Sequence, residues 1–422
     1  MTKMTKRIYY DNSGAHEFDS VVEEAIPASS GSRPALILRE SAFYPTSGGQ
    51  IHDLGYLTIG GDDRETNRLR VTEVADAEDG RVIHYLDASA NTPVTGTAVH
   101  GVIDRERRRD HMQQHSGQHI LSAAFIELYQ IPTVSFHMAE DYCSIDLTTL
   151  ALTANQIEGA EKRANEIIFE NRPVHIRYVT RAEAEKLGLR KLPPADRDEL
   201  RLIEVADYDL SACGGTHVGA TGQIGSILLR KTEKVRQGTR VEFVCGDRAV
   251  RIARRDFVAL SEAASLFSAK LWDVPEQIRK NAEETRALRK EKDEALEELA
   301  QSIAQVELGS QPETAGRRVI MRSFTDRDVN FAKLFAQKLT RGAAPVVALV
   351  ASTLPPAGIV FAQTPAAAGA TPSPSDMGAL LKQILVSVGG RGGGSRDFAQ
   401  GGVPAGTNVE QILQQAADTI KA

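Results

Sequence analysis

Residues 111–125 read HMQQHSGQHILSAAF, a stretch that decides where the chemistry of the chain must lie. His111, His115 and His119 fall four residues apart in a segment whose pattern predicts a helix over 108–129. Their imidazoles therefore project from roughly one face of that helix. Neutral imidazole is a common metal ligand, but two such ligands rarely bind zinc well by themselves. The stretch predicts a metal site whose other ligands come from elsewhere in the chain.

The missing ligands are found in residues 211–219, SACGGTHVG, where Cys213 and His217 are again four residues apart. The two glycines between them favour a tight loop over a helix interior. Imidazole and thiolate are donors that zinc prefers, and four of them make a tetrahedral set. We interpret His115, His119, Cys213 and His217 as one Zn2+ site.

We assign other roles to four further histidine, serine and cysteine residues. His111 lies one turn too early to be an obvious ligand, so we place it at the surface or in the layer of residues behind the ligands. Ser116 stands where a zinc peptidase of the HExxH type needs glutamate, which excludes that class. Cys143 and Cys245 lie in strand-like sequence, where we expect them to be buried as small hydrophobic residues.

The composition is that of a globular protein. The chain has 422 residues, 41% of them hydrophobic, a net charge of -6 and three cysteines. This length is typical of about three domains with packed cores. The longest apolar run, APVVALVA, is far shorter than the roughly 20 residues that span a bilayer. Three cysteines do not make a disulfide framework and favour a reducing compartment. We expect no membrane contact and a cytoplasmic location.

The sequence patterns predict an α+β multidomain protein with four parts. Residues 1–104 carry short β-rich runs broken by Gly, Pro and Asp, which is typical of a small antiparallel β-barrel. Residues 105–250 mix helix and strand patterns and contain the zinc ligands. Residues 251–310 predict a long helical or coiled-coil arm, because aliphatic residues recur every three or four positions among charges. Residues 311–422 alternate β and α patterns again, which indicates a C-terminal α/β domain.

With these motifs in hand, the sequence resembles the alanyl-tRNA editing proteins, the AlaX family, and the editing domain of alanyl-tRNA synthetases. Their zinc-binding signatures are matched by RRDHMQQHSGQHILSAAF and SACGGTHVGATGQIG, and their glycine-rich FYP-x-x-GGQ element by AFYPTSGGQIHDLGYL. VSFHMAEDYCSIDL resembles the strand region between the signatures. VGGRGGGSRDFAQGG, at 388–402, resembles the end of the DHH-associated domain that closes the synthetases and the long editing proteins. The chain departs from the family at Cys245, where threonine is usual, and at Arg391, where lysine is usual.

The resemblance implies a zinc-dependent hydrolase that removes serine, and also glycine, from mischarged tRNA(Ala). Polar groups near the glycine-rich element are thought to recognise the serine hydroxyl in the family, which in this chain points to Thr46, with Gly48, Gly49 and Gln50 beside it. We expect a free-standing editing protein that does not charge tRNA. Too few residues precede the first matched element for a class II adenylating core.

Basic clusters are the expected contacts for tRNA phosphates, since arginine binds phosphate even on an acidic protein. We assign this role to Arg107, Arg108 and Arg109, and to Arg391 and Arg396 in the C-terminal glycine-rich stretch. The resemblance also implies that the C-terminal domain binds tRNA. The helical arm either bridges its neighbours or pairs with a second copy, so a homodimer through the arm or the C-terminal domain is one expectation.

Two alternatives stay open. The first is a non-catalytic tRNA-binding protein with a structural zinc, because four protein ligands close a tetrahedral site whereas a catalytic zinc keeps one position open. The second is editing of another tRNA, such as Ser-tRNA(Thr), because threonyl-tRNA synthetases carry a similar pair of motifs. The FYP-x-x-GGQ element and the C-terminal domain argue against the second.

Overall fold

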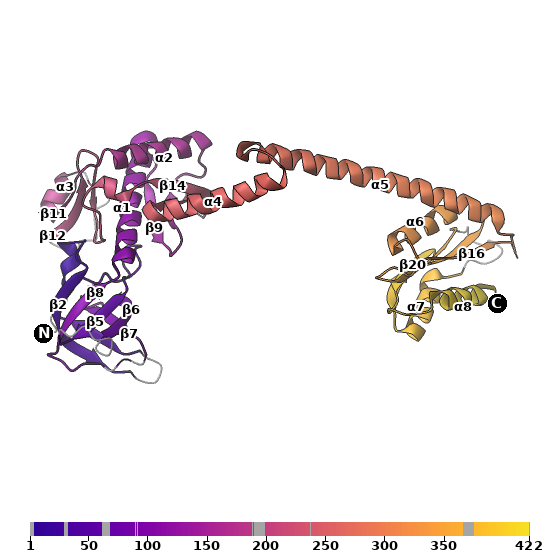
Figure 1. Ribbon diagram of the computed structural model, residues 1–422, viewed down its shortest axis with the longest axis horizontal. Helices are drawn as coiled ribbons and strands as arrows, with labels where there is room; N and C mark the ends of the chain where they lie inside the picture. Colours follow the sequence, from indigo (N-terminus) through magenta and orange to yellow (C-terminus); the bar gives the residue numbers. More distant parts are fainter. Residues whose placement is uncertain are drawn as a thin grey trace. The chain divides into compact units, whose positions relative to one another are not determined.

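A computed structural model of the chain divides into two compact units, Met1–Glu262 and Ala263–Ala422 (Figure 1). The structure describes residues 4–28, 33–60, 68–88, 90, 92–187, 189, 199–236, 238–314, 316–365 and 375–421. The predicted boundaries at 104, 250 and 310 would divide these units further and stay predictions.

The first unit begins with a closed antiparallel barrel of six strands in the order β2-β3-β7-β6-β5-β8. Its strands are β2 Glu17–Ile26, β3 Ala35–Leu38, β5 Gly55–Ile59, β6 Arg68–Asp76, β7 Val82–Leu86 and β8 Ala98–Ile103. Alternate residues point inward, as the two-residue period of a strand requires. The inward side chains, among them Val22, Leu36, Leu57 and Val71, form one apolar cluster. The predicted N-terminal β-barrel is confirmed.

The barrel leads into helix α1, Arg105–Tyr129, the predicted helix with three more residues at its start. Asp104 caps it, because its carboxylate accepts hydrogen bonds from the backbone N–H of Glu106 and of Arg107 at 3.1 and 3.0 Å. Gln130 ends the helix in the left-handed conformation, with φ of 55°. Most of α1 between these caps is buried, so the helix forms the centre of the unit and not its surface.

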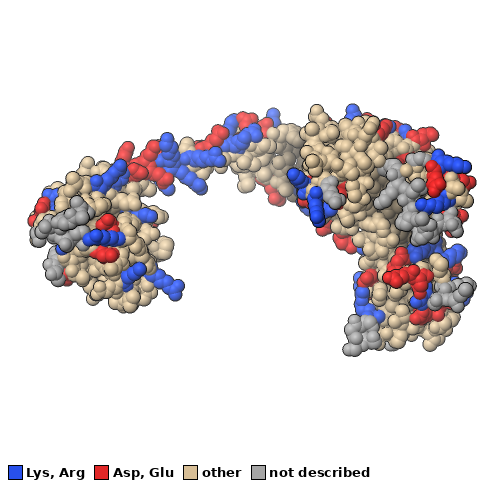
Figure 2. All heavy atoms as spheres, turned by 180° about the vertical axis from the view of Figure 1, so that it is seen from behind, with Lys and Arg blue, Asp and Glu red and all other residues tan. Residues whose placement is uncertain are grey.

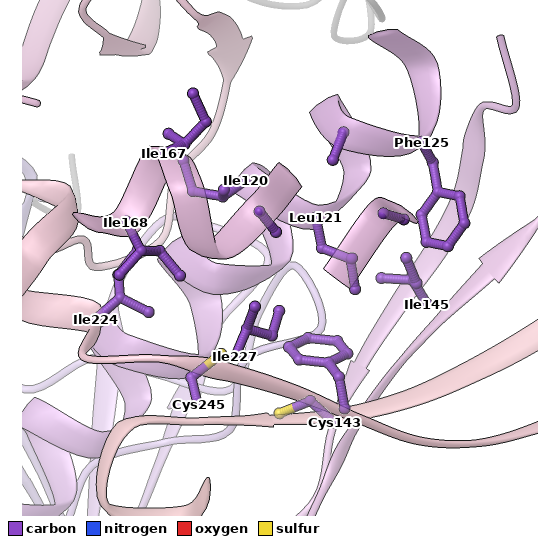
Figure 3. Packing of buried hydrophobic residues seen from close by; sticks show 14 of the residues in the cluster. Ile120, Leu121, Phe125, Cys143, Ile145, Ile167, Ile168, Ile224, Ile227 and Cys245 are labelled. Atoms are coloured by element: carbon purple, nitrogen blue, oxygen red, sulfur yellow. The ribbon is translucent and has the colours of Figure 1, made fainter. Parts of the chain in front are cut away.

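Two sheets and a second helix surround α1. The four-stranded sheet has the order β14-β15-β10-β9 and the three-stranded sheet the order β11-β12-β13. Their strands are β9 Thr133–Met138, β10 Cys143–Leu147, β11 Val174–Thr180, β12 Glu199–Val205, β13 Asp209–Ala212, β14 Ile227–Val235 and β15 Gly238–Cys245. Helix α2, Ala154–Phe169, packs beside α1, and its isoleucines join the apolar core in Figure 3. Cys143 and Cys245 are buried in this core, as predicted.

Close packing of α1 on β15 depends on the absence of a side chain at Gly117. A Cβ atom added there would lie 2.2 Å from the sulfur of Cys245, which is far inside van der Waals contact. Because Gly117 lies between His115 and His119 in sequence, this contact fixes the depth at which α1 sits against the sheet. Glycine at this position therefore supports the placement of both histidines.

The predicted arm consists of two helices, α4 Gly246–Leu266 and α5 Val274–Ser310, with a break over 267–273. Pro275 follows the first residue of α5, a position that suits proline because early helical N–H groups have no partner in the helix. The last part of α5 packs through Ala300 and Ala304 against helix α6, Val329–Thr340, and at its start Val274 is buried. Leu288, in the middle of α5, is by contrast 57% exposed. Pairing of the arm with a second copy stays a prediction.

The second unit holds a five-stranded mixed sheet in the order β16-β17-β18-β20-β19. Its strands are β16 Arg318–Phe324, β17 Val346–Ser352, β18 Gly358–Gln363, β19 Arg391–Gly394 and β20 Phe398–Gly402. Helices α5 and α6 cover one face, and α7 Met377–Val388 and α8 Val409–Lys421 cover the other. Only β16 and β17 are parallel, so the predicted α/β layering is present but built mainly on antiparallel pairs. No helix in the described part of the chain is long and apolar enough to cross a bilayer.

We predict that His84 makes the barrel sensitive to acid. Its ring is buried between the Ser41 hydroxyl at 2.7 Å and the Leu36 carbonyl oxygen at 3.1 Å, and burial lowers its pKa to about 4. Above pH 6.5 the ring is neutral in both states, and between pH 6.5 and 4 only the unfolded chain takes up the proton. The free energy of unfolding should therefore fall by about 3 kcal/mol across that window because of this group.

The measurement is urea unfolding at several pH values for the wild type and for His84→Asn, which keeps a donor toward Leu36. The variant should be less stable at pH 7 but lose less stability on acidification. His100→Asn, a substitution of an exposed histidine, serves as the matched control, and its free energy of unfolding should change with pH as steeply as that of the wild type. An equally steep change with pH in the His84 variant would contradict the prediction.

Candidate metal centre

The four predicted ligands meet at one point inside the first unit. His115 and His119 come from successive turns of α1, and Cys213 and His217 come from the loop that follows β13. Their ligand atoms all lie within 4.8 Å of one another. Sγ of Cys213 is 3.3 Å from Nε2 of His115 and 3.3 Å from Nε2 of His217. The three imidazoles are almost fully buried and shielded from bulk water, whereas the Cys213 side is partly exposed.

The separations and the chemistry of this cluster fit a tetrahedral metal ion. Ligand bonds of ordinary length to zinc place a sulfur and a nitrogen about 3.5 Å apart, close to the separations in the cluster. Each histidine also has an oxygen facing its other ring nitrogen: Gln50 Oε1 at 2.7 Å from His115, Ser116 Oγ at 3.3 Å from His217, and Asp209 Oδ2 at 3.6 Å from His119. Such outer partners fix the tautomer and the orientation of a metal-binding imidazole.

The electrostatics favour a thiolate at the centre of the cluster. Burial would raise the pKa of the Cys213 thiol, but the adjacent His115 and His217 lower it well below its usual value. Burial lowers the pKa of His217 to about 3, so this ring is neutral. Burial also opposes protonation of His119, yet Asp209 and Cys213 together raise its pKa to about 9. Thiolate and neutral imidazole are the forms that bind a metal, so Cys213 and His217 already have them, whereas His119 has to lose a proton when an ion binds.

The loop that carries Cys213 and His217 is held by Arg201 of β12. The guanidinium donates from Nη1 to the carbonyl oxygens of Cys213 at 2.6 Å and Gly215 at 3.1 Å. Nε of the same side chain donates to the carbonyl oxygen of Tyr10 at 2.9 Å. Sequence reasoning missed this residue, because a single arginine in a strand 12 positions before the cysteine carries no signal of its own.

Two glycines of the sequence motifs are required by close approach. A Cβ atom at Gly215 would lie 2.2 Å from Cε1 of His115, so only glycine lets the loop reach the helix. At Gly49, with φ of 83°, a Cβ atom would lie 2.3 Å from the carbonyl oxygen of Phe136. The glycine-rich element thus forms a tight turn against β9, and its predicted contact with substrate through Gly48 and Gly49 stays a prediction.

Gln50, the last residue of that turn, connects the barrel to the cluster. Its side chain is buried, receives a hydrogen bond from the backbone N–H of Thr216 at 3.2 Å and donates to Oγ1 of Thr216 at 2.9 Å. These hydrogen bonds hold the Gln50 amide, and its Oε1 lies 2.7 Å from Nδ1 of His115, which fixes the orientation of the His115 ring. Thr46, by contrast, is exposed, and its hydroxyl lies 3.0 Å from Nδ1 of His52, which is not one of the four ligands.

The structure corrects two predictions about α1. Arg108 was expected to contact tRNA, but its side chain is 2% exposed and forms a buried ion pair with Asp53. A guanidinium enclosed in this way has no surface to offer a phosphate. His111 was placed at the surface or behind the ligands, and the surface alternative is wrong because its side chain is fully buried. Neither nitrogen of His111 has a hydrogen-bond partner among the described residues.

The other predicted arginines lie nearer to solvent. Arg107 forms a two-point ion pair with the exposed Glu140, and Arg109 is 58% exposed beside Asp247. Arg391 begins β19 and Arg396 follows that strand, both with exposed positions in the second unit. These four keep their predicted role in tRNA binding as a proposal.

We predict that Cys213 is the reactive thiol of the metal-free protein. It is partly exposed and has a lowered pKa, whereas Cys143 and Cys245 are fully buried with pKa values raised by burial. Iodoacetamide at pH 7 should therefore modify Cys213 at least about tenfold faster than the other two, as followed by peptide mass spectrometry. Adding Zn2+ first should protect Cys213. Equal rates for the three thiols, or no protection, would contradict this assignment.

Comparison with known proteins agrees with the motifs. Residues 2–107 match the family described as tRNA synthetases class II (A), and residues 200–241 match the family described as threonyl and alanyl tRNA synthetase second additional domain. The second match contains Cys213 and His217. A solved structure, the C-Ala domain from Aquifex aeolicus alanyl-tRNA synthetase, covers 27% of this chain and 99% of its own, at 19% identity and a TM-score of 0.22.

Full-length relatives extend the match to the whole chain. The alanyl-tRNA editing protein AlaX-L of Pyrococcus horikoshii is 28% identical over 424 residues, covering 99% of both chains. The alanine-tRNA ligases of Pyrococcus furiosus and Archaeoglobus fulgidus are each 30% identical, but the chain spans only 36% and 43% of their lengths. The chain is thus a relative, from end to end, of the alanyl-tRNA editing protein AlaX-L and of the matching part of alanine-tRNA ligases.

Proposed function

We propose that this protein is an aminoacyl-tRNA hydrolase that removes serine, and also glycine, from mischarged tRNA(Ala). The observation that carries the proposal is the cluster of His115, His119, Cys213 and His217 in a chain related to AlaX-L over its whole length. Matches to translation proteins alone would not separate editing from other roles. Two residues of this cluster, Cys213 and His217, lie in the part related to the threonyl and alanyl second additional domain, which supports a chemical role there.

Zn2+ is the metal that suits this donor set best. Three imidazoles and one thiolate are borderline to soft ligands, and their separations match a small tetrahedral ion better than the larger oxygen cages of calcium or magnesium. When bound, zinc would supply Lewis-acid polarisation of the ester carbonyl. Gln50 and Ser116 contact Nδ1 of His115 and of His217, and Nε2 of both rings faces Sγ of Cys213, so little reorganisation of these two rings is needed for binding.

The proposed reaction is hydrolysis of an aminoacyl ester on the terminal ribose of tRNA. The bond between the carbonyl carbon and the ribose oxygen breaks, and a water oxygen forms the new bond to that carbon. One proton of the water goes to the ribose oxygen, and the amino acid leaves as a carboxylate after losing the other. The shielded position of the cluster suits this chemistry, because charge developing on the carbonyl oxygen is stabilised more strongly where bulk water is excluded.

Serine is selected over alanine in this proposal by a hydrogen bond to the side-chain hydroxyl. A site built to bond a hydroxyl rejects an analogue that lacks it more strongly than an apolar pocket rejects an added hydroxyl. Thr46 is the proposed partner, and the turn through Gly48 and Gly49 to Gln50 links it to His115. The exposed position of Thr46 supports access to substrate, and among the described residues its hydroxyl is hydrogen-bonded to the side chain and the backbone N–H of His52.

The tRNA body would be bound by charge at several points. Arg107 and Arg109 at the start of α1, and Arg391 and Arg396 in the second unit, are the proposed phosphate contacts. On the face drawn in Figure 2, basic and acidic side chains alternate along the helical arm and over both units. This mixture supports discrete phosphate contacts over binding by one broad basic surface. A substrate of this kind places the protein in the cytoplasm with the translation machinery.

A non-catalytic tRNA-binding protein is the second candidate. It is supported by one observation, that four potential ligand atoms lie within 4.8 Å of one another, which is the number that a structural zinc site uses. In the main proposal His115, His119, Cys213 and His217 would hold the ion, and the ion would act on the ester as a Lewis acid. Editing of Ser-tRNA(Thr) is a third candidate, since one matched family includes threonyl synthetases. Turnover and tRNA identity separate the three.

We predict that the protein releases serine from Ser-tRNA(Ala) at least about a hundredfold faster than alanine from Ala-tRNA(Ala), and that Cys213→Ala abolishes release. Loss of the thiolate removes one ligand and leaves three imidazoles, so the zinc content should fall in parallel. Deacylation of labelled tRNA and metal analysis of the same samples measure both. Cys143→Ala, which truncates a cysteine outside the cluster, should keep zinc and activity.

Two results would redirect the proposal. No release from either substrate, with tRNA still bound, would favour the non-catalytic candidate. Faster release from Ser-tRNA(Thr) than from Ser-tRNA(Ala) would favour the third candidate.

We also predict that Thr46→Val narrows the ratio of serine to alanine release by about tenfold, since a lost hydrogen bond of about 1.4 kcal/mol changes a rate by that factor. Valine keeps the shape of threonine and removes only the hydroxyl. Thr72→Val, on barrel strand β6, is the matched control and should leave the ratio unchanged. An unchanged ratio in Thr46→Val would show that Thr46 does not recognise the serine hydroxyl.

A further inference from the structure

The hydroxyl of Thr46 is held by a histidine that is not one of the four predicted ligands. Nδ1 of His52 lies 3.0 Å from Oγ1 of Thr46, and the backbone N–H of His52 donates to the same oxygen at 3.2 Å. The two residues stand on either side of a tight turn, which Ser47 and Gln50 close with two backbone hydrogen bonds of 3.0 and 2.9 Å. His52 therefore contacts the Thr46 hydroxyl at two points.

Both sides of this loop are fixed on neighbouring elements. The backbone N–H of Thr46 donates to the carbonyl oxygen of Val74 on β6 at 3.2 Å. The carbonyl oxygen of His52 accepts a hydrogen bond from Nε of Arg107 on α1 at 3.1 Å. Side chains that are held by such surrounding contacts keep one geometry before a ligand arrives. The direction of the Thr46 hydroxyl is thus determined by the fold.

The His52 ring is neutral at pH 7. The residue is half-buried, and burial lowers its pKa below the usual value of a histidine. The positive charge of Arg107 lowers the pKa as well, while the carboxylates of Glu73 and Asp53 oppose this shift. A neutral imidazole carries a proton on one ring nitrogen and accepts a hydrogen bond at the other.

The backbone of Thr72 on β6 indicates which nitrogen carries that proton. Its hydrogen bond to the ring raises the pKa of His52. A backbone group has this effect when its carbonyl oxygen accepts from a ring N–H, because the contact stabilises the protonated form. Nδ1 faces Thr46, so we assign the N–H to Nε2. In this tautomer Nδ1 is an acceptor, and the Thr46 hydroxyl donates its proton to it.

These contacts leave Thr46 with a single function toward a ligand. A hydroxyl group has one proton to donate and two lone pairs that accept. The proton goes to Nδ1 of His52, and one lone pair receives the backbone N–H of His52. One lone pair remains, and the residue is exposed. Thr46 therefore offers an acceptor to a ligand, but no donor.

We propose that His52 is a positioning residue that makes Thr46 a hydrogen-bond acceptor only, so that the site selects amino acids whose side chain donates a hydrogen bond. The inference rests on the proposed function, in which Thr46 meets the serine hydroxyl. Serine donates through its hydroxyl proton, and alanine has no such group. O-methylserine keeps the oxygen but has lost the proton, so it would place a lone pair against a lone pair.

The first test compares the ratio of serine to alanine release from tRNA(Ala) in two variants. His52→Leu removes the acceptor and should narrow the ratio at least about threefold, with the zinc content of the wild type. His52→Asn puts an amide oxygen near the position of Nδ1 and should keep most of the ratio. His175→Leu, at an exposed position of β11, is the matched control and should release both amino acids as the wild type does.

A double variant shows whether His52 acts through Thr46. Because both substitutions affect one hydroxyl, Thr46→Val combined with His52→Leu should narrow the ratio no further than Thr46→Val alone. A role of His52 in the stability of the loop alone would instead make the two losses add. Additive losses would overturn the inference.

The second test uses O-methylserine on tRNA(Ala). The wild type should release it about as slowly as alanine. His52→Leu should release it faster than the wild type does, because the Thr46 proton is then free to donate to the ether oxygen. Nitrogen NMR of histidine-labelled protein gives a readout without turnover: at pH 7 the His52 ring, identified by its absence in His52→Asn, should carry its proton on Nε2.

The outcomes separate this inference from the proposed function. A proton on Nδ1, fast release of O-methylserine by the wild type, or an unchanged serine to alanine ratio in His52→Leu would overturn the inference and leave the hydrolase intact. Absence of release from every substrate would refute the hydrolase and, with it, the role of His52 in selection.

Discussion

The buried ion pair between Arg108 and Asp53 holds the first unit together. Arg108 also donates to the carbonyl oxygens of Ser13 at 2.8 Å and Ala42 at 2.5 Å, and Asp53 accepts from the backbone N–H of Tyr44 at 2.7 Å. These contacts join α1 to the N-terminal segment and to the segments around the glycine-rich turn. A buried charge left without its partner is strongly unfavourable, so helix and turn are tied to one relative position. That position puts Gln50 behind His115.

The cluster of His115, His119, Cys213 and His217 could be predicted from sequence because the signal is local. Spacing of four residues in a helix puts His115 and His119 on one face, and two glycines between Cys213 and His217 indicate a loop. The barrel was predictable for the same reason, since its strands alternate within a few residues. The chemistry of the donors, imidazoles and a thiolate, suggested that these distant pairs belong together, and the family resemblance agreed with it.

The sequence did not reveal which residues of α1 are buried. Arg108 lies among Arg107 and Arg109 in a run that looks solvated, but α1 is central, so the residue that faces Asp53 is buried while its neighbours reach solvent. The surface alternative for His111 failed for the same reason. Arg201 was missed because its partners are backbone carbonyl groups, which leave no residue-type signature. Whether such a side chain is buried depends on packing between segments far apart in sequence, which a local sequence pattern does not indicate.

The cluster joins chain segments that are far apart in sequence, and this has a consequence for folding. Gln50 and His115 are separated by 65 residues, and His115 and Cys213 by 98. Closing such long loops costs entropy before any contact compensates for it, so non-local sites of this kind form late. A metal ion can meet all four donors only after the barrel, the helix and the loop have assembled. The rate of metal uptake would then report the last stage of folding, and metal binding would stabilise the assembled unit by mass action.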